Sequence, residues 1–326
     1  MATQMKLRFS AKERVFLGLT ALLAPIFACE LYGVSVMRDR EPFRVNAAMP
    51  QVADLAVGFA FALLFVALRF VLTKAFQPIG RLILAPHKRS TERIERFATV
   101  LFKFLYFIGV TGAGYYVMKD EKWFPRSLGG HGDVVESYRI LDQPPSPQLK
   151  LYYFVQLGYH THSLLYMLLL TPIRNDFLEM LLHHVATIFL IGCSYLANYT
   201  AKGALVAYVH DIGDVTGYAI KSVVDTGNTP LVVVMYIVLL VSWAYTRLVV
   251  FPRDLIYNAI AVVPQVNPNV SQFFLAPVNA MLCMLQLLHV YWYTLFLVMG
   301  YTLLTTGKQE DIQNQIPDKT ESKKTK

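Results

Sequence analysis

The stretch FLEMLLHHVATIFLIGCSYLA, residues 177–197, decides how this chain is interpreted. It is apolar over about 20 residues, which is enough to cross the ~30 Å hydrocarbon core of a bilayer. His183 and His184 nevertheless lie side by side near its middle. Ionisable side chains are costly inside a membrane and usually face a bundle interior or a wet cavity. The pair therefore indicates a functional site within a membrane-spanning helix.

The next apolar segment, residues 203–223, carries three further ionisable side chains, His210, Asp211 and Asp214. With the two histidines they favour a membrane enzyme that has a histidine–carboxylate centre. The alternative is structural, because polar side chains also hold neighbouring transmembrane helices together by hydrogen bonds. A cluster of ionisable residues on two adjoining segments favours the enzyme.

The whole chain has the composition of a polytopic membrane protein. It has 326 residues, of which 55% are hydrophobic and 16% charged, against roughly 25% charged in a soluble domain. The predicted fold class is all-α, with about eight transmembrane helices. These helices are expected at residues 15–37, 52–72, 97–118, 149–171, 177–197, 203–223, 230–250 and 272–304.

The first of these segments is interpreted as a retained anchor, with a signal peptide as the alternative. It is long, contains Glu30 and lacks a clean small-residue cleavage site. The three cysteines, Cys29, Cys193 and Cys283, all lie within predicted spans. They imply neither a disulfide framework nor a zinc site.

The distribution of charge predicts the orientation. Eight spans put both termini on one side, and the loops on that side carry the excess of Lys and Arg that marks the cytosol. The last four residues, Lys323 to Lys326, resemble a dilysine signal for return to the endoplasmic reticulum, which works only on a cytosolic tail. The predicted location is therefore the endoplasmic reticulum membrane. The net charge of +8 belongs to this topology, and no nucleic acid partner is expected.

Three connections are long enough to matter. Residues 73–96 form a basic cytosolic loop, which either lies on an anionic membrane surface or is simply solvated. On the opposite side, 119–148 is either a structured loop or a flexible lid, and 251–271 is expected to be a Pro-rich loop. The sequons at Asn198 and Asn269 lie so close to predicted spans that the sequence leaves glycosylation open.

Polar residues recur on one face of each of the two histidine-bearing segments. Positions i, i+4, i+7 and i+11 of an α-helix share a face. The two faces carry, in the first segment, Asp176, His183, Thr187, Ser194 and Asn198, and in the second His210, Asp214, Gly217 and Lys221. Two facing polar stripes predict an internal cavity. Gly213 and Gly217 permit close helix approach or access for a ligand.

His183 and Asp214 are expected at similar depth in the membrane. If the two segments are antiparallel, their levels differ by about one helical turn at ~1.5 Å rise per residue. A carboxylate can then hold one ring nitrogen of His183 and leave the other free. A neutral imidazole held in this way is a base or a nucleophile near neutral pH.

The histidine spacing predicts no metal site. Of the eight histidines, only His160–His162 and His183–His184 are clustered, and neither spacing fits the HxxxH and HxxHH boxes of membrane di-iron enzymes. His160 and His289 lie on further polar faces, where interhelical hydrogen bonding explains them as well as chemistry does.

The residues on these segments form a recognisable motif. It comprises Arg174-Asn175-Asp176-Phe177, His183-His184, Ser194-Tyr195, Asn198, Gly203, His210-Asp211, Asp214 and Lys221. This run closely resembles the longevity-assurance motif of ceramide synthases, in the TLC-domain superfamily. The resemblance covers roughly 95–310 and includes Tyr245-Thr246-Arg247-Leu248 and the stretch around His289. Asn175, Ala201 and Tyr218 stand where that family usually has Lys, Arg and Glu.

The resemblance implies a sphingoid base N-acyltransferase that uses fatty acyl-CoA, built on a TLC-type barrel of six transmembrane helices. The catalytic residues it implies are His183, His184, His210, Asp211 and Asp214. The substrate-binding candidates are Arg174, Asp176, Ser194, Asn198, Tyr218 and Lys221. No cofactor or metal is expected, because a thioester is already activated; acyl-CoA is the co-substrate. His183 is expected either to accept the acyl group or to act as general base.

The resemblance also implies a domain division and partners. Residues 1–94 hold the N-terminal tail, two transmembrane helices and the basic loop; 95–306 form the TLC domain; 307–326 are a disordered tail. Besides acyl-CoA, the sphingoid base and membrane lipid, a homodimer, a heterodimer or a small accessory subunit remain open. In this family the last luminal connection is thought to set acyl selectivity, which here is 251–271. The alternative function is a non-catalytic TLC protein that binds or regulates lipids.

Overall fold

The computed structural model describes residues 11–170, 176–268 and 270–306, and these form helices joined by short turns. Arg174, Asn269 and the tail from residue 307 lie outside the described residues. The long helices are α1 (Ala11–Arg38), α3 (Leu55–Ile83), α4 (Thr91–Met118), α5 (Pro147–Leu169), α6 (Phe177–Leu196), α7 (Thr200–Val223), α8 (Thr229–Trp243), the π-helix η5 (Ala244–Val262) and α10 (Gln272–Thr306). The short ones are α2 (Glu41–Val45), η1 (Val52–Asp54), η2 (Pro86–Lys88), η3 (Arg126–Leu128), η4 (Val134–Tyr138) and α9 (Val263–Val266).

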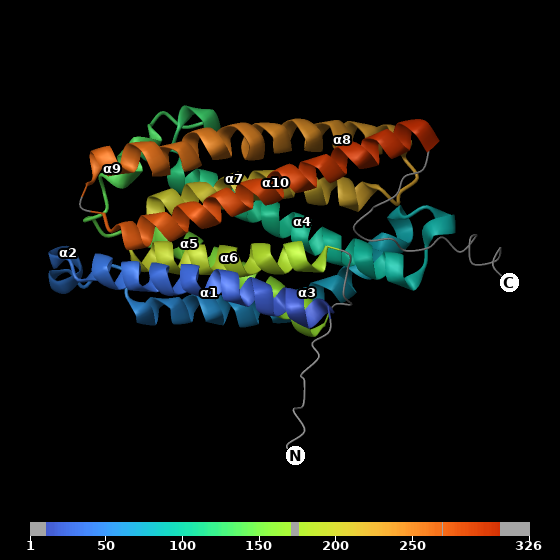
Figure 1. The fold of residues 1–326 in the computed structure, drawn as a ribbon. Coiled ribbons are helices and arrows are strands. Elements are labelled where there is room, and N and C mark those ends of the chain that lie inside the picture. Colours follow the sequence, from blue (N-terminus) through green and yellow to red (C-terminus); the bar gives the residue numbers. More distant parts are fainter. Residues whose placement is uncertain (1–10, 171–175, 269, 307–326) are drawn as a thin grey trace, which may run out of the picture.

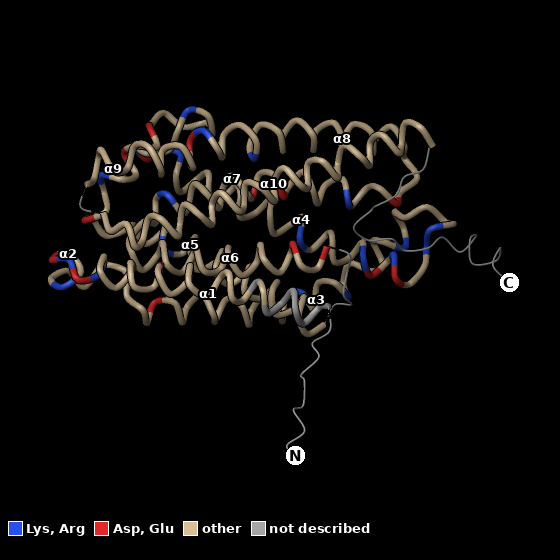
Figure 2. The backbone as a smooth tube through the Cα atoms, in the orientation of Figure 1, with Lys and Arg blue, Asp and Glu red and all other residues tan. Residues whose placement is uncertain are grey.

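The long helices run side by side in one elongated bundle (Figure 1), and charged residues gather towards its two ends (Figure 2). Within the described ranges, six helical segments are long and apolar enough to cross a membrane: Thr20–Arg38, Val52–Ile83, Thr91–Met118, Phe177–Leu196, Thr229–Val266 and Gln272–Thr306. The protein is therefore a multi-pass membrane protein. α5 and α7, the other two predicted spans, are less apolar because they carry many of the inward polar residues.

The helices around α6 and α7 form a ring, and two helices pack outside it. α4, α5, α6, α10, η5, α8 and α7 contact one another around an interior cavity, whereas α3 packs on α4 and α5, and α1 packs on α6 and α10. Gly33 makes the α1–α10 approach close, since a Cβ there would meet the backbone of Phe273. Large apolar side chains such as Leu63, Phe70 and Leu287 point outward and are exposed, as lipid-facing residues would be.

Two connections differ from what the sequence predicted. Most of the expected 251–271 loop is helix, because α8 continues without a break through η5 and α9 to Val266. η5 is a π-helix, a rare form that is usually short and frequent at functional sites. The predicted 73–96 loop is also shorter, because α3 runs on to Ile83 and α4 begins at Thr91. Pro86, which fixes the backbone and lacks an N–H, stands between them.

Helix starts follow capping rules. The side chains of Ser90, Ser146 and Asn228 accept hydrogen bonds from the backbone N–H three residues on, and so begin α4, α5 and α8. The segment 119–148 is a structured cap rather than a flexible lid, since Phe124 and Tyr138 within it are 0% and 1% exposed. It covers the end of the bundle where α5 and α7 begin, which is the predicted luminal end.

Candidate functional site

The bundle encloses a cavity of about 480 Å³ that extends from His183 to the predicted cytosolic end, where Arg96, Val224 and Leu303 line it. We call it the large cavity. Helices α3 to α8, η5 and α10 all contribute to its wall. The polar stripes of α6 and α7 face it as the sequence predicted, since Asp176, His183, Asp214, Gly217 and Lys221 are all lining residues.

His183 is a buried imidazole at the inner limit of this cavity. Its side chain is 9% exposed, and its Nδ1 has no hydrogen-bond partner among the described residues. The ring stands edge-on to Trp292 at 5.5 Å between centroids and nearly parallel to His210 at 6.2 Å. Packing therefore fixes the orientation of the ring without occupying this nitrogen.

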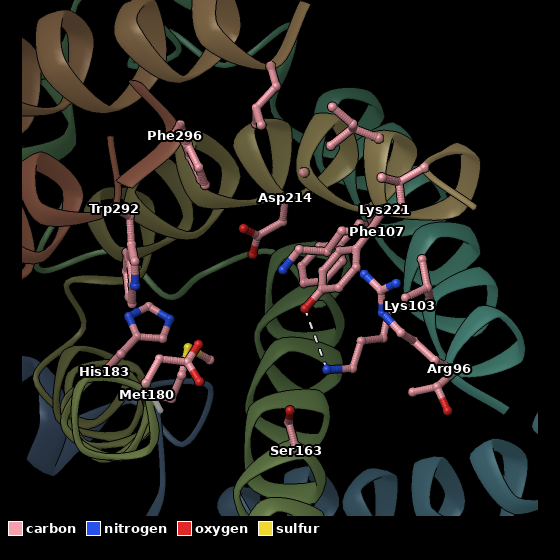
Figure 3. A pocket seen from close by; sticks show the side chains of 18 of the residues that line it. Arg96, Lys103, Phe107, Ser163, Met180, His183, Asp214, Lys221, Trp292 and Phe296 are labelled. Atoms are coloured by element: carbon pink, nitrogen blue, oxygen red, sulfur yellow. Dashed lines mark hydrogen bonds between the residues drawn. The ribbon is translucent and has the colours of Figure 1, made fainter. Parts of the chain in front are cut away.

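Asp214 points into the same cavity from α7, on the wall across from His183 (Figure 3). The sequence predicted that its carboxylate would hold a His183 nitrogen. In the described structure Arg247 is its partner instead, with the guanidinium Nη2 donating to Asp214 Oδ1 at 3.0 Å. This prediction was wrong because a cation from η5 had not been considered as a competitor for the carboxylate.

Arg247 is the functional residue that sequence reasoning missed, although it lies in a quoted motif. It is 1% exposed, donates to the backbone oxygen of His210 at 2.8 Å, and lies 4.3 Å from the ring centroid of Trp243. Gly213 makes room for it, because a Cβ there would lie 2.9 Å from Nε of Arg247. A lone Arg in an otherwise apolar segment was the signal that could have identified it.

The other motif histidines surround His183. The ring centroid of His184 lies 5.5 Å from that of His183 and 6.2 Å from that of His160. His210 approaches His289 with its Nε2 3.0 Å from the partner Nε2, and its Nδ1 is 2.7 Å from the backbone oxygen of Val206. A carbonyl only accepts, so this Nδ1 carries the hydrogen.

Asp211 faces away from both cavities. The hydroxyl of Tyr152 donates to its Oδ2 at 2.8 Å, and the amide of Gln156 donates to the same oxygen. Asp211 thus links α7 to α5, and the structure does not bring it to the cavity with Asp214.

The substrate-binding candidates divide in the same way. Asp176, Tyr218 and Lys221 line the large cavity, and Ser194 lines a narrower space described below. Asn198 lines neither: it lies at the sharp turn between α6 and α7 with a φ of 60°, and its Nδ2 donates to Leu141 O at 2.7 Å and to Gln143 O at 2.8 Å. This buried nitrogen is engaged by the structured cap of residues 119–148, which leaves no room for a glycan. Arg174 lies outside the described residues.

Cations dominate the part of the large cavity nearest the predicted cytosolic end. Arg96, Lys103 and Lys221 lie together on the side away from His183 (Figure 3), with Lys103 Nζ 3.5 Å from the hydroxyl of Tyr218. Arg69 joins them from α3, with its guanidinium carbon 3.4 Å from the ring centroid of Tyr166. We call these four residues the cation group. Arg96 Nη1 also lies 2.9 Å from Asp225 Oδ2, which offsets its charge. The remaining excess of cations over Asp176 in this part of the wall favours a ligand that carries negative charge.

A second, narrower cavity of about 70 Å³ continues from His183 towards the predicted luminal end, and we call it the slot. The two cavities share His160, His183 and Asp214. Beyond these residues most of the slot wall is apolar: Leu190, Ile191, Val206, Ala207, Ala259, Leu275, Val278, Leu282 and Leu285. His183 therefore lies where a polar space meets an apolar one. Within the described ranges, no group of three or more His, Cys, Asp or Glu residues is placed to hold a metal ion.

Fold and site together define a class of protein. It is a helical membrane protein that holds a buried histidine between a cationic cavity and a mostly apolar slot. The chain belongs to the TLC domain family, since a profile of that domain matches residues 96–298. It is 24% identical to Ceramide synthase LOH1 of Arabidopsis thaliana over 269 residues, which are 76% of this chain and 85% of that protein.

Human ceramide synthases 4 and 3 are also similar. They are 29% and 30% identical over 226 and 207 residues, which are 69% and 63% of this chain. The chain spans about half the length of these two proteins, 55% and 51%. The resemblance to ceramide synthases that the motif indicated is thereby confirmed.

Proposed function

We propose that the protein transfers the acyl group of a fatty acyl-CoA to the amine of a sphingoid base. The observation that carries this proposal is the position of His183. A buried imidazole with a ring nitrogen that no described residue occupies faces a carboxylate, between a cationic cavity and an apolar slot. A fatty acyl-CoA fits this arrangement, because its phosphate-bearing end matches the cationic cavity and its hydrocarbon end matches the slot.

Each half of the acyl-CoA substrate matches the chemistry of one of the two cavities. The phosphates of CoA match the cation group, because charge-assisted hydrogen bonds to phosphate are stronger than neutral ones. The hydrocarbon chain matches the slot, whose wall is mostly apolar, because leaving water is worth about 25 cal/mol for each Å² of apolar surface. The thioester carbonyl then lies beside His183, where the two cavities meet.

Two routes are consistent with His183 in this place. In the first, a ring nitrogen attacks the carbonyl carbon, the C–S bond breaks and CoA leaves as the thiolate, which takes up a proton. The amine then attacks the acyl-imidazole, the C–N bond to the ring breaks, and the amide forms with loss of the amine proton. In the second, His183 takes the amine proton and the amine attacks the thioester carbonyl directly; the C–S bond breaks, and the CoA thiolate leaves and takes up the proton that His183 accepted.

Asp214 and Arg247 support either route. The Asp214 carboxylate faces the cavity with 28% of its side chain exposed, so it is available to attract the ammonium of the base. Arg247 holds the carboxylate in place and offsets its charge, since an unpaired buried anion is strongly unfavourable. Arg247 acts here as a positioning residue.

Location and partners follow as part of the proposal. The motif and the relatives called ceramide synthases support acyl-CoA and a sphingoid base as substrates. The predicted orientation places the cation group towards the cytosol, where CoA is dissolved. The endoplasmic reticulum is proposed from the dilysine-like tail.

The direct test is transfer by purified protein in detergent or liposomes, supplied with a sphingoid base and acyl-CoAs of several lengths. Formation of N-acyl product that depends on His183 is expected. Binding of the base without product, unchanged in His183→Gln, would favour the non-catalytic lipid-binding alternative.

A further inference from the structure

The far end of the slot is polar, although its wall is mostly apolar. Lys202, Tyr138 and Tyr199 line it at the predicted luminal end, where α7 begins and the structured cap of residues 119–148 closes the bundle. All three side chains are buried, with Lys202 only 6% exposed. A methyl-ended hydrocarbon chain that reached this point would meet the buried Nζ of Lys202.

These groups have hydrogen-bonding capacity to spare. The Nζ of Lys202 carries at least two N–H donors, and burial lowers its pKa well below the usual value. One donor goes to the backbone oxygen of Asp254 at 3.1 Å, and the Nζ lies 5.0 Å from the ring centroid of Tyr138. The hydroxyls of Tyr138 and Tyr199 are buried and have no partner among the described residues. Burial also raises the pKa of both phenols well above the usual value, so both keep their protons.

Buried polar groups without partners are unusual and costly unless a ligand or water satisfies them. The residue after Lys202 is tightly packed: at Gly203 a Cβ would meet the hydroxyl of Tyr153 and lie 2.9 Å from Oγ of Ser194. The slot wall next to Lys202 therefore has no room for a larger side chain at this position.

We propose that Lys202, Tyr138 and Tyr199 form a subsite for an oxygen at the far end of the acyl chain. This subsite makes the protein prefer ω-hydroxyacyl chains of the length that reaches it over methyl-ended chains of equal length. The inference rests on the proposed acyl transfer. The hydroxyl oxygen would accept a hydrogen bond from the Nζ of Lys202, and its hydrogen would be donated to a tyrosine oxygen.

The distance of the subsite from His183 along the slot determines which acyl chain length reaches it. Lys202 lies eight residues before His210 on α7, which at ~1.5 Å rise per residue places it about 12 Å from the level of the motif histidines. Shorter ω-hydroxyacyl chains would place their hydroxyl along a mostly aliphatic wall, where single polar groups such as Thr187 and Asn279 are the available partners. The preference is therefore expected to be greatest at the length that reaches Lys202, whereas a general tolerance of hydroxyl groups would not depend on length.

The test compares saturated acyl-CoAs with their ω-hydroxy counterparts, matched carbon by carbon, in competition for one sphingoid base. At the length that reaches Lys202 the wild-type protein should favour the ω-hydroxy chain by about fivefold, the factor that corresponds to one net buried hydrogen bond. At shorter lengths this preference should be clearly smaller.

Three variants complete the test. Lys202→Met should remove the ω-hydroxy preference and improve use of the methyl-ended chain of that length. Tyr199→Phe, which removes a hydroxyl that bonds to no described residue, should reduce the preference while leaving folding intact. Lys150→Met is the matched control, because Lys150 Nζ donates to the Ala48 backbone oxygen at the same end of the bundle and lines neither cavity.

Equal use of both chain types at every length by the wild-type protein would overturn the subsite, and so would a preference unchanged in both Lys202→Met and Tyr199→Phe. Absence of transfer from any acyl-CoA would instead overturn the proposed function, and the subsite with it.

Discussion

The large cavity and the slot meet at His183, which lines both, yet the rest of their walls consists of different kinds of side chain. The large cavity is lined by Arg69, Arg96, Lys103 and Lys221, and aromatic rings such as Tyr166 lie between the charges. The slot is narrow and mostly aliphatic, with Thr187, Ser194 and Asn279 as polar interruptions before its polar end at Lys202. The same two helices, α6 and α7, form parts of both. A change of environment along one pair of helices is thus enough to separate a charged ligand end from a hydrocarbon end.

The largest effect is expected where the two cavities meet, at His183 and Asp214, which we call the boundary. His183→Ala should lower acyl transfer by at least about 100-fold, the lower end of what a general base contributes. Asp214→Asn should also be severe, and the double variant should be little worse than either single one, because the residues act as a unit. Transfer by purified, normally inserted protein is the measurement, with His87→Ala, outside both cavities, as the control. Substantial activity in His183→Ala would move the role to His184.

Arg247 should rank next. Arg247→Met leaves the Asp214 carboxylate without its buried partner, a loss that costs about 3–5 kcal/mol in comparable pairs. We expect a lower melting temperature and a lower kcat. Arg247→Lys keeps the charge without the planar fork that reaches both Asp214 and the His210 backbone, so it should recover stability more than kcat. Equal recovery of both would show that charge alone matters and would refute a positioning role.

The sequence predicted the residues at the boundary better than it predicted the residues that hold them in place. Periodicity identified the polar stripes of α6 and α7, and the structure turns His183, Asp214 and Lys221 into the same cavity. It did not identify Arg247, because a cation on a distant helix reaches Asp214 only through tertiary packing. Asp211 shows the same limit. Asp214, three residues further along the motif, faces the large cavity, whereas Asp211 accepts a hydrogen bond from Tyr152 on α5.

Helix ends were harder to predict than helix existence. The expected loop at 251–271 contains Pro252 and Pro264, which normally end a helix, yet the π-helix carries the chain through Pro252. In a π-helix the backbone hydrogen bonds skip one more residue, and sequence patterns based on a 3.6-residue period do not reveal that change. Arg69 was missed because it lies in the second predicted span, 52–72, which was assigned to the region before the TLC domain.

The cation group should affect the affinity for acyl-CoA more than the chemical step. Lys103→Met removes one charge that faces the phosphates, and it should raise the KM for acyl-CoA by about tenfold with a smaller change in kcat. The difference should shrink at high salt, since screening weakens the wild-type interaction. Lys74→Met on α3 is the control, because Lys74 lies over the Phe70 ring and lines neither cavity. A fall in kcat at unchanged KM would contradict a binding role.

A smaller effect is expected from the predicted luminal end. Exchange of residues 253–271 for the matching segment of a synthase with another preference should move the favoured chain length and leave the catalytic step intact. The segment contributes Ala259 to the slot, and the Asp254 backbone oxygen accepts from Lys202. An active chimera with an unchanged acyl profile would place the determinant on the slot walls formed by α6, α7 and α10.

The smallest effect is expected from removal of metal ions. The chemistry assigned to the boundary needs an imidazole and a thioester that is already activated, and both substrate ends are recognised by charge and hydrocarbon. Incubation with strong chelators should therefore leave the rate unchanged, and elemental analysis of the purified protein should find no stoichiometric zinc or iron. The spacing of the histidines supports this expectation, because His160–His162 and His183–His184 match no known metal box. Activity lost on chelation and restored by one particular ion would show that the boundary holds a metal, and the roles of His183 and Asp214 would have to be reassigned as ligands.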